Sequence, residues 1–304
     1  MPTQVSPAAE VVEIHDYRHP QGWSGAPDKR TREACDRLER GAILLLRGIP
    51  YDFPRADIDF LLQHQAEDSR LHKNVSYRPT EDLLRGFGGS GEEEERVHEI
   101  LRNYSRAVTE FIGRLLAPYA GRWTLDYASF RPLEEAGREL SLHKRGDLLH
   151  VDAFPSRPTR GARILRVFTN IHPQKNRVWL AGLPFEPLAE QYAPAAGLQQ
   201  YAGGSSGRLR ALFGGPKRSA YDSFMLHFHD WMKENSTLQD GLPRAQVEFP
   251  PNTTWLVYTD TVPHAVLSGQ FALEQTFLVP IEAMVTPQVA PLRVLERLAG
   301  RAMA

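Results

Sequence analysis

The chain has 304 residues, of which 41% are apolar, and a formal net charge of -1 at neutral pH. This length and composition are typical of a globular protein with a substantial core. The charge gives no general attraction for nucleic acid, and we expect no nucleic-acid partner. The single cysteine, Cys35, excludes an intramolecular disulfide and a cysteine-based metal site.

The first 120 residues are expected to be mainly helical support. After a proline-containing tail, helical patterns cover residues 29–40 and 58–65, and the apolar run AILLLRGIP at 42–50 predicts a buried strand between them. A glycine-rich loop and an acidic helix start come next. Apolar side chains then recur at helical spacing from 96 to 119, the strongest helix signal in the chain.

Beyond residue 120 the pattern becomes that of strands. Eight short segments are rich in β-branched and aromatic residues, and glycine, proline, asparagine or aspartate separates them. Glycine-rich turns and the helical stretch YDSFMLHFHDWMKEN interrupt this series at about 185–240. The eight segments are WTLDYASFRPL, LLHVDAF, ARILRVFTNI, RVWLAG, RAQVEFP, TTWLVYTD, HAVLSG and EQTFLVPIEAMV.

These patterns predict a single α+β domain over residues 1–304. Its core, at 121–290, would be a double-stranded β-helix, the jelly-roll or cupin-like arrangement of two facing sheets, and the N-terminal helices would back one sheet. No segment has the pattern of a membrane span or of a secretion signal, so we expect a cytoplasmic protein.

The stretch LHVDAF carries a histidine and an aspartate two residues apart. In an extended chain His150 and Asp152 point to the same side. Such a pair alone is most often structural. A second histidine from a distant strand would complete the two imidazoles and one carboxylate that bind Fe(II) in non-haem oxygenases. His264, in TDTVPHAVLSG, is the natural third ligand.

A triad of this kind leaves coordination positions for a 2-oxo acid and for dioxygen. The second carboxylate of that co-substrate needs a cation, and arginine binds carboxylates in bidentate fashion. In ARILRVFTNI, alternation places Arg166 on the same face as Phe168 and Asn170. An arginine among apolar neighbours either binds an anion or extends to solvent. Arg131, in the preceding predicted strand, is a second candidate.

The chain resembles the Fe(II)/2-oxoglutarate-dependent Kdo 3-hydroxylases of Gram-negative bacteria in HVDAFPSRPTRGARILRVFTNIHP, FMLHFHDWMKEN and VPHAVLSGQFALEQTF. The resemblance implies that His150, Asp152 and His264 hold the iron and that ascorbate supports activity. It implies hydroxylation of carbon 3 of 3-deoxy-D-manno-oct-2-ulosonic acid (Kdo). The substrate would be a Kdo-containing lipid A precursor or lipopolysaccharide core, reached by peripheral contact with the inner membrane.

The region after His264 departs from the wider oxygenase superfamily. Many members carry an arginine or lysine there that binds 2-oxoglutarate, whereas this chain reads FALEQTFLV. Gln275 and Thr276 can hydrogen-bond a carboxylate but cannot neutralise it. This departure favours Arg166 for the cationic role.

Recognition of an anionic sugar on a phosphate-bearing carrier should need further cations. In the helical interpretation of FMLHFHDWMKEN, the spacing of His227 and His229 puts them on different faces, so they form no ligand pair. As part of a lid helix, His229 and Lys233 could contact sugar, the alternative being a core helix with histidines at its rim. Other candidates, each alone more often a solvated surface charge, are Arg157, Arg160, Lys217 and Arg218.

Two other functions are consistent with the same residues. One is a 2-oxoglutarate oxygenase that acts on another sugar, a lipid or a peptide side chain. The other is a non-catalytic jelly-roll protein that binds sugar and whose metal is structural. Release of carbon dioxide from 2-oxoglutarate separates the two classes, because a binding module performs no decarboxylation.

Overall fold

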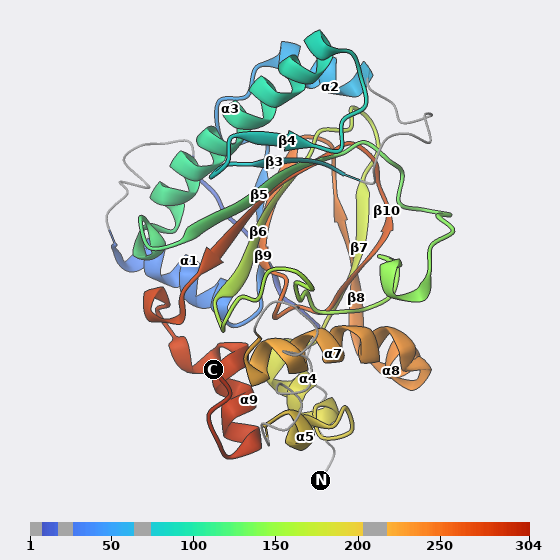
Figure 1. Cartoon of the computed structure of the whole chain (residues 1–304). Coiled ribbons are helices and arrows are strands. Elements are labelled where there is room, and N and C mark those ends of the chain that lie inside the picture. Colours follow the sequence, from blue (N-terminus) through green and yellow to red (C-terminus); the bar gives the residue numbers. More distant parts are fainter. Residues whose placement is uncertain (1–7, 18–26, 64–73, 203–217) are drawn as a thin grey trace.

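The structure is a computed structural model that describes residues 8–17, 27–63, 74–202 and 218–304. Two β-sheets face each other at its centre, one of eight strands and one of three (Figure 1). Helices lie along the outside of the large sheet and gather below the sheets in this view. The predicted α+β double-stranded β-helix is confirmed.

The large sheet carries most of the strands. They are β1 (Val11–Glu13), β2 (Ile43–Arg47), β3 (Val75–Arg78), β4 (Leu83–Arg85), β5 (Thr124–Arg131), β6 (Arg163–Asn170), β9 (Thr253–Tyr258) and β11 (Ala272–Val279). Their order is β1-β2-β9-β6-β11-β5-β3-β4. The pair β1 and β2 is parallel, and all other neighbours are antiparallel. Strand β6 therefore lies near the centre, between β9 and β11.

The small sheet faces the large one and has the antiparallel order β10-β7-β8. Its strands are β7 (Arg177–Gly182), β8 (Arg244–Phe249) and β10 (His264–Ser268). Aromatic side chains from both sheets pack between them: the rings of Phe249 and Trp255 stack with centroids 3.9 Å apart, and Trp179 meets Trp255 edge to face. This cluster joins the two sheets.

Helices of the N-terminal half back the large sheet. They are α1 (Lys29–Glu39), α2 (Arg55–Gln63) and α3 (Gly91–Leu115). The strongest helix prediction is confirmed in type but shifted. Ser90 and Glu93 form a reciprocal capping box that starts α3 earlier than predicted, and Pro118, in the following 3-10 turn (Ala117–Tyr119), ends it earlier.

Strands are more frequent in the first 120 residues than mainly helical support would require. The structure adds β1, β3 and β4 to the predicted β2, and all four extend the large sheet. The additional strands have three or four residues each, too few for alternation to stand out in the sequence. Their pairing partners, β2 and β5, are distant in the sequence.

The segment LLHVDAF is not a strand, contrary to the prediction. Only His150 pairs with another chain segment, through an isolated antiparallel bridge to His264. The Asp152 amide then donates to the Thr259 carbonyl at 2.8 Å, so the chain changes partner within two residues. Extended backbone without a continuous ladder explains why the sequence resembled a strand. The described part of 121–290 thus holds seven strands rather than eight.

The predicted helical insertion lies between β7 and β8. Its described helices are α4 (Phe185–Tyr192), α5 (Leu198–Ala202), α7 (Ala220–Glu234) and α8 (Ser236–Gly241). They pack with a C-terminal helix that the sequence analysis did not predict, α9 (Pro291–Ala299). None of the described helices combines the length and hydropathy that crossing a membrane requires.

Candidate active site

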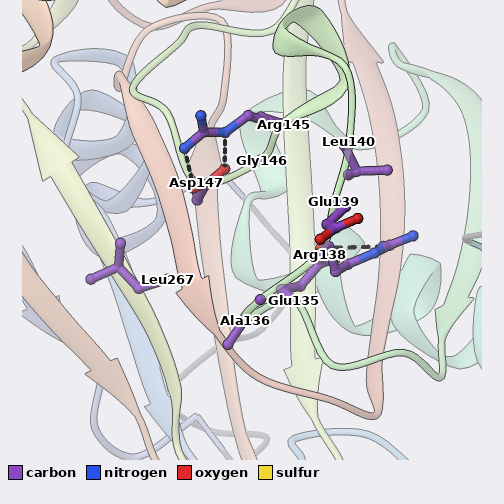
Figure 2. A pocket seen from close by; sticks show the side chains of 10 residues that line it. Glu135, Ala136, Arg138, Glu139, Leu140, Arg145, Gly146, Asp147 and Leu267 are labelled. Atoms are coloured by element: carbon purple, nitrogen blue, oxygen red, sulfur yellow. Dashed lines mark hydrogen bonds and ion pairs between the residues drawn. The ribbon is translucent and has the colours of Figure 1, made fainter.

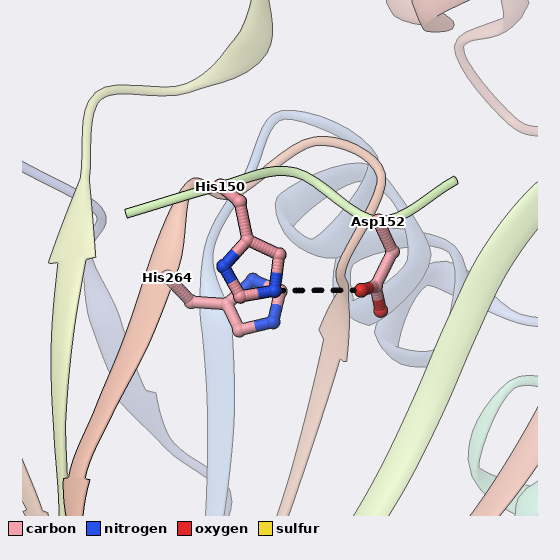
Figure 3. A group of neighbouring side chains, drawn as sticks. All are labelled: His150, Asp152 and His264. Carbon is pink, nitrogen blue, oxygen red and sulfur yellow. Dashed lines mark ion pairs between the residues drawn. The ribbon is translucent and has the colours of Figure 1, made fainter. Parts of the chain in front are cut away.

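His150, Asp152 and His264 converge on one point (Figure 3). His264 begins β10 and exchanges two backbone hydrogen bonds with His150, at 2.9 and 3.2 Å. One ligand atom from each of the three side chains lies within 4.8 Å of the others. A single metal ion can therefore contact all three residues.

Both imidazole rings offer Nε2 as the ligand atom. Nδ1 of His150 lies 2.7 Å from the Leu148 carbonyl. Nδ1 of His264 lies 3.0 Å from the Val262 carbonyl. Because a carbonyl only accepts, each Nδ1 carries the hydrogen and each Nε2 keeps its lone pair. Two neutral nitrogens and one carboxylate suit Fe(II), so these residues fit a non-haem iron ion.

The environment holds the three side chains in the protonation states that metal binding requires. Burial lowers the pKa of His264, and together with His264 and Lys233 it takes the pKa of His150 well below its usual value. Burial opposes ionisation of Asp152, but the Arg166 guanidinium outweighs it and lowers the pKa of this carboxyl. Arg166 Nη2 lies 3.0 Å from Asp152 Oδ2, an ion pair without hydrogen-bond alignment.

A cavity of about 220 Å³ opens beside the triad. Three arginines from neighbouring strands line it: Arg131 at the end of β5, Arg166 in β6 and Arg177 at the start of β7. The sequence analysis proposed Arg166 and Arg131 as co-substrate ligands, and the structure places both in this cavity. An anion can therefore lie beside the metal position and meet several guanidinium groups.

Two buried carboxylates orient these arginines. Glu274 accepts from Arg131 Nε at 2.8 Å and from Arg166 Nη1 at 2.7 Å. Burial would raise the pKa of Glu274, but Arg131 and Arg166 outweigh it and lower the pKa. Glu135 lies 3.8 Å from Arg131 and 3.6 Å from Arg177. The guanidinium groups are thus fixed before any ligand arrives.

The sequence analysis missed Arg177 and Trp179. Alternation in RVWLAG places both on one face, which was the available signal. Arg177 is 1% exposed and donates to the Gly269 carbonyl at 3.1 Å, and burial together with Arg131 lowers its pKa to about 10. A Cβ atom at Gly269 would lie 2.6 Å from Arg177 Cγ, so this close approach requires glycine. Trp179 stacks on His264 with ring centroids 5.2 Å apart.

Helix α7 covers the triad, as expected of a lid helix. The His229 ring meets the His150 ring edge to face at 5.1 Å, and Lys233, one turn later, lines the cavity. His227 points elsewhere, stacks on Tyr201 and contacts the Ala196 carbonyl at 3.0 Å. The two histidines therefore lie on different faces, as the spacing predicted.

Asn170 and Gln275, both expected to contact the co-substrate, lie outside the cavity lining. The Asn170 amide donates to the carbonyls of Lys175 and Phe249, at 3.0 and 2.9 Å. The Gln275 amide donates to the Asp126 carbonyl at 3.0 Å. Both side chains satisfy backbone groups at sheet positions, which local sequence patterns cannot distinguish from ligand binding.

The other candidate substrate cations lie away from the cavity, where described. Arg157 stacks on Tyr127 at 3.8 Å and pairs with Asp126 at 2.9 Å. Arg160 is exposed, and its backbone amide donates to Asp222. Arg218 donates to the carbonyl of Pro155. Lys217 lies outside the described residues.

A second, larger hollow of about 660 Å³ adjoins the cavity (Figure 2). Residues 135–140, 145–147 and Leu267 line it, and Glu135, Arg145 and Gly146 line the inner cavity as well. Arg145 is held by Asp147, with nitrogen–oxygen distances of 3.0 and 2.7 Å. We call this outer hollow the vestibule, because it shares its walls with the cavity at the triad.

Two facing sheets, a His-Asp-His site and an adjoining cavity lined with arginines are the features of a non-haem Fe(II)/2-oxoglutarate-dependent dioxygenase. Residues 22–302 match the family of 3-deoxy-D-manno-oct-2-ulosonic acid (Kdo) hydroxylase. This chain belongs to the Kdo hydroxylase family.

Solved structures of the Kdo hydroxylase KdoO agree with this membership. The complex of KdoO with α-ketoglutarate and Fe(III) is 32% identical, with a TM-score of 0.83 and 97% of each chain covered. The cobalt(II) complex is 33% identical, with a TM-score of 0.83 and coverage of 96% of this chain and 97% of that one. The succinate and Fe(III) complex has 32% identity, a TM-score of 0.82 and the same coverage. No curated protein sequence matches the chain.

Proposed function

We propose that this Kdo hydroxylase adds a hydroxyl group to carbon 3 of Kdo while the sugar is attached to a lipid A precursor or to the lipopolysaccharide core. The observation that supports it most directly is the triad beside an arginine-lined cavity, in a chain of this family. Iron, 2-oxoglutarate and dioxygen together supply the oxidising power that replaces a carbon–hydrogen bond by a hydroxyl group. A non-catalytic sugar-binding protein is not favoured.

In this proposal His150, Asp152 and His264 hold the iron. Their ligand atoms are preorganised by backbone pairing, and the ion pair between Asp152 and Arg166 keeps the carboxylate in place. The aromatic side chain of Trp179 supports His264 from the core. The protein thereby fixes the metal position and limits access of water from the core side.

The three arginines would bind 2-oxoglutarate. Arg166 lies beside the metal ligands, whereas Arg131 and Arg177 share the carboxylate Glu135 on the other side of the cluster. A dicarboxylate that reaches from the metal along this row meets cations at both ends. Arg166 would therefore orient the metal-facing part, and Arg131 and Arg177 the distal carboxylate.

Replacing Arg131 with methionine should weaken 2-oxoglutarate binding by about 1.5–3 kcal/mol, because a charge-assisted contact is lost while all metal ligands stay. Anaerobic titration of the iron-loaded variant measures this affinity. Arg157→Met is the matched control, since Arg157 also pairs with a carboxylate but lies outside the cavity lining. Equal affinity in wild type and Arg131→Met would remove Arg131 from the co-substrate site.

We further propose that the chain functions as one oxygenase domain on the cytoplasmic side of the inner membrane, where contact with the lipid-linked sugar is peripheral. The family match over residues 22–302 supports a single functional unit. The vestibule beside the active-site cavity offers room for the part of the substrate that extends beyond the reacting sugar.

The proposed function is tested by incubating the iron-loaded protein with 2-oxoglutarate, dioxygen and a lipid-linked Kdo acceptor. Mass spectrometry should show one added oxygen atom on Kdo, and nuclear magnetic resonance should place it on carbon 3. Asp152→Ala is the inactive control. Oxidation of 2-oxoglutarate with no oxygen added to Kdo, or oxygen added at another carbon, would contradict the proposal.

A further inference from the structure

The cavity beside the triad is more positive than its metal and co-substrate require. Among the described lining residues, six are lysine or arginine and two are carboxylates. The buried Glu274 and the exposed Asp147 each compensate one more cation from behind. Fe(II) and the two carboxylates of 2-oxoglutarate cancel each other in charge. A net positive charge remains for a further anion.

Most of these cations already face a carboxylate of the protein. Arg131, Arg166 and Arg177 contact Glu274 or Glu135, and Arg145 contacts Asp147. Lys144 is exposed at the end of the 3-10 turn Leu142–Lys144. The remaining cation is Lys233 of α7, which is only 6% exposed. It is thus the buried lysine of the cavity.

Lys233 is positioned close to the metal ligands. It follows His229 by one helical turn on the same face of α7, and the His229 ring contacts His150 at 5.1 Å. Its Nζ donates to the His143 carbonyl at 3.0 Å, which joins α7 to the segment that leads into the triad. Lys233 therefore lies on the helix side of the cavity, opposite the strands that carry the arginines.

The chemistry of the substrate requires a cation at such a position. In a 2-ulosonic acid the carboxylate is carbon 1, so it is two bonds from carbon 3. A sugar that presents carbon 3 to the metal must place its carboxylate within a few bond lengths of the same point. The cation that receives it must lie inside the cavity rather than in the vestibule.

We propose that Lys233 binds the carbon 1 carboxylate of the sugar and so turns carbon 3 toward the metal position. The rest of the substrate then extends through the opening at Arg145 and Gly146 into the vestibule (Figure 2). This inference rests on the proposed function and assigns to Lys233 the specificity for an acidic sugar.

The test compares lipid-linked Kdo with its carbon 1 carboxamide, in detergent micelles, for wild type and Lys233→Met. Wild type should prefer the acid about ten- to a hundredfold in kcat/KM, because the amide cannot form a charge-assisted bond with the ammonium group. Lys233→Met should lose this preference and turn over the amide much as wild type does. Lys233→Arg, which keeps the charge, should retain part of the preference.

A structural role would give a different result. If Lys233 only ties α7 to the His143 carbonyl, Lys233→Met slows both sugars equally and the preference for the acid survives. Lys29→Met, an exposed lysine of α1, is the matched control and should behave as wild type. Anaerobic binding of both sugars to the iron-loaded proteins provides a readout without turnover. Iron content and 2-oxoglutarate affinity should be unchanged in every variant.

The outcomes separate the inference from the function beneath it. If wild type hydroxylates the acid and the amide equally well, the inference is overturned whether or not Lys233→Met folds. An acid preference that persists in a folded Lys233→Met also overturns it. If wild type adds no oxygen to lipid-linked Kdo, the proposed function fails, and the inference fails with it.

Discussion

Replacing Asp152 with alanine is expected to abolish stable iron binding and, with it, hydroxylation. The carboxylate is the one anionic ligand of the triad, and its loss leaves two neutral imidazoles beside the Arg166 guanidinium, which then repels a cation. Loss of an outer-shell partner of a metal ligand typically costs about 10–100-fold in affinity, so loss of a ligand should cost more. Anaerobic iron analysis after gel filtration should give about one iron per wild-type chain and almost none for Asp152→Ala.

His264→Ala should show the same loss, because His264 supplies the ligand from the small sheet. His227→Ala is the matched control: this histidine also lies near the triad in sequence space of α7, but its ring contacts Tyr201 and the Ala196 carbonyl. Its iron content should equal that of wild type. Undiminished iron in both Asp152→Ala and His264→Ala would refute the metal site.

Replacing Arg163 with methionine should reduce the free energy of unfolding by about 3–5 kcal/mol, because the change leaves a buried carboxylate unpaired. Arg163 is fully buried, its Nε donates to Asp260 Oδ2 at 2.9 Å, and its guanidinium lies 4.2 Å from the Tyr258 ring centroid. Urea unfolding followed by circular dichroism measures the loss. Arg47→Met is the control, since the Arg47 ion pair with Glu13 is largely exposed.

The pH dependence gives this prediction a second test. Burial raises the pKa of Asp260 above its usual value even though Arg163 opposes the shift. Removing Arg163 removes that opposition and should raise the pKa further. A carboxyl with a raised folded-state pKa stabilises the fold at low pH and loses this contribution as pH rises above its unfolded value. The deficit of Arg163→Met should therefore grow from pH 5 to pH 8, and a pH-independent deficit would contradict the mechanism.

Much of the metal site could be predicted because its signals are local. His150 and Asp152 are two residues apart on extended backbone, and His264 stands in a strand pattern bounded by Pro263 and Gly269. The long helix α3 and the strands β5 to β11 were predictable for the same reason, since periodicity acts over a few residues. Local patterns also explain the error at LLHVDAF, where extended backbone has no continuous strand partner.

The sequence by itself determined the class of fold, the identity of the three ligands and the resemblance to the Kdo 3-hydroxylases. Only the tertiary structure decided which cations face the metal. Arg131, Arg166 and Arg177 come from three strands, and Lys233 comes from a helix of the insertion. Asn170 has the same alternation as Arg166, yet its amide satisfies backbone carbonyls. The physical reason is that a side chain becomes a ligand through contacts between distant segments, and these depend on strand order and helix packing rather than on its neighbours in sequence.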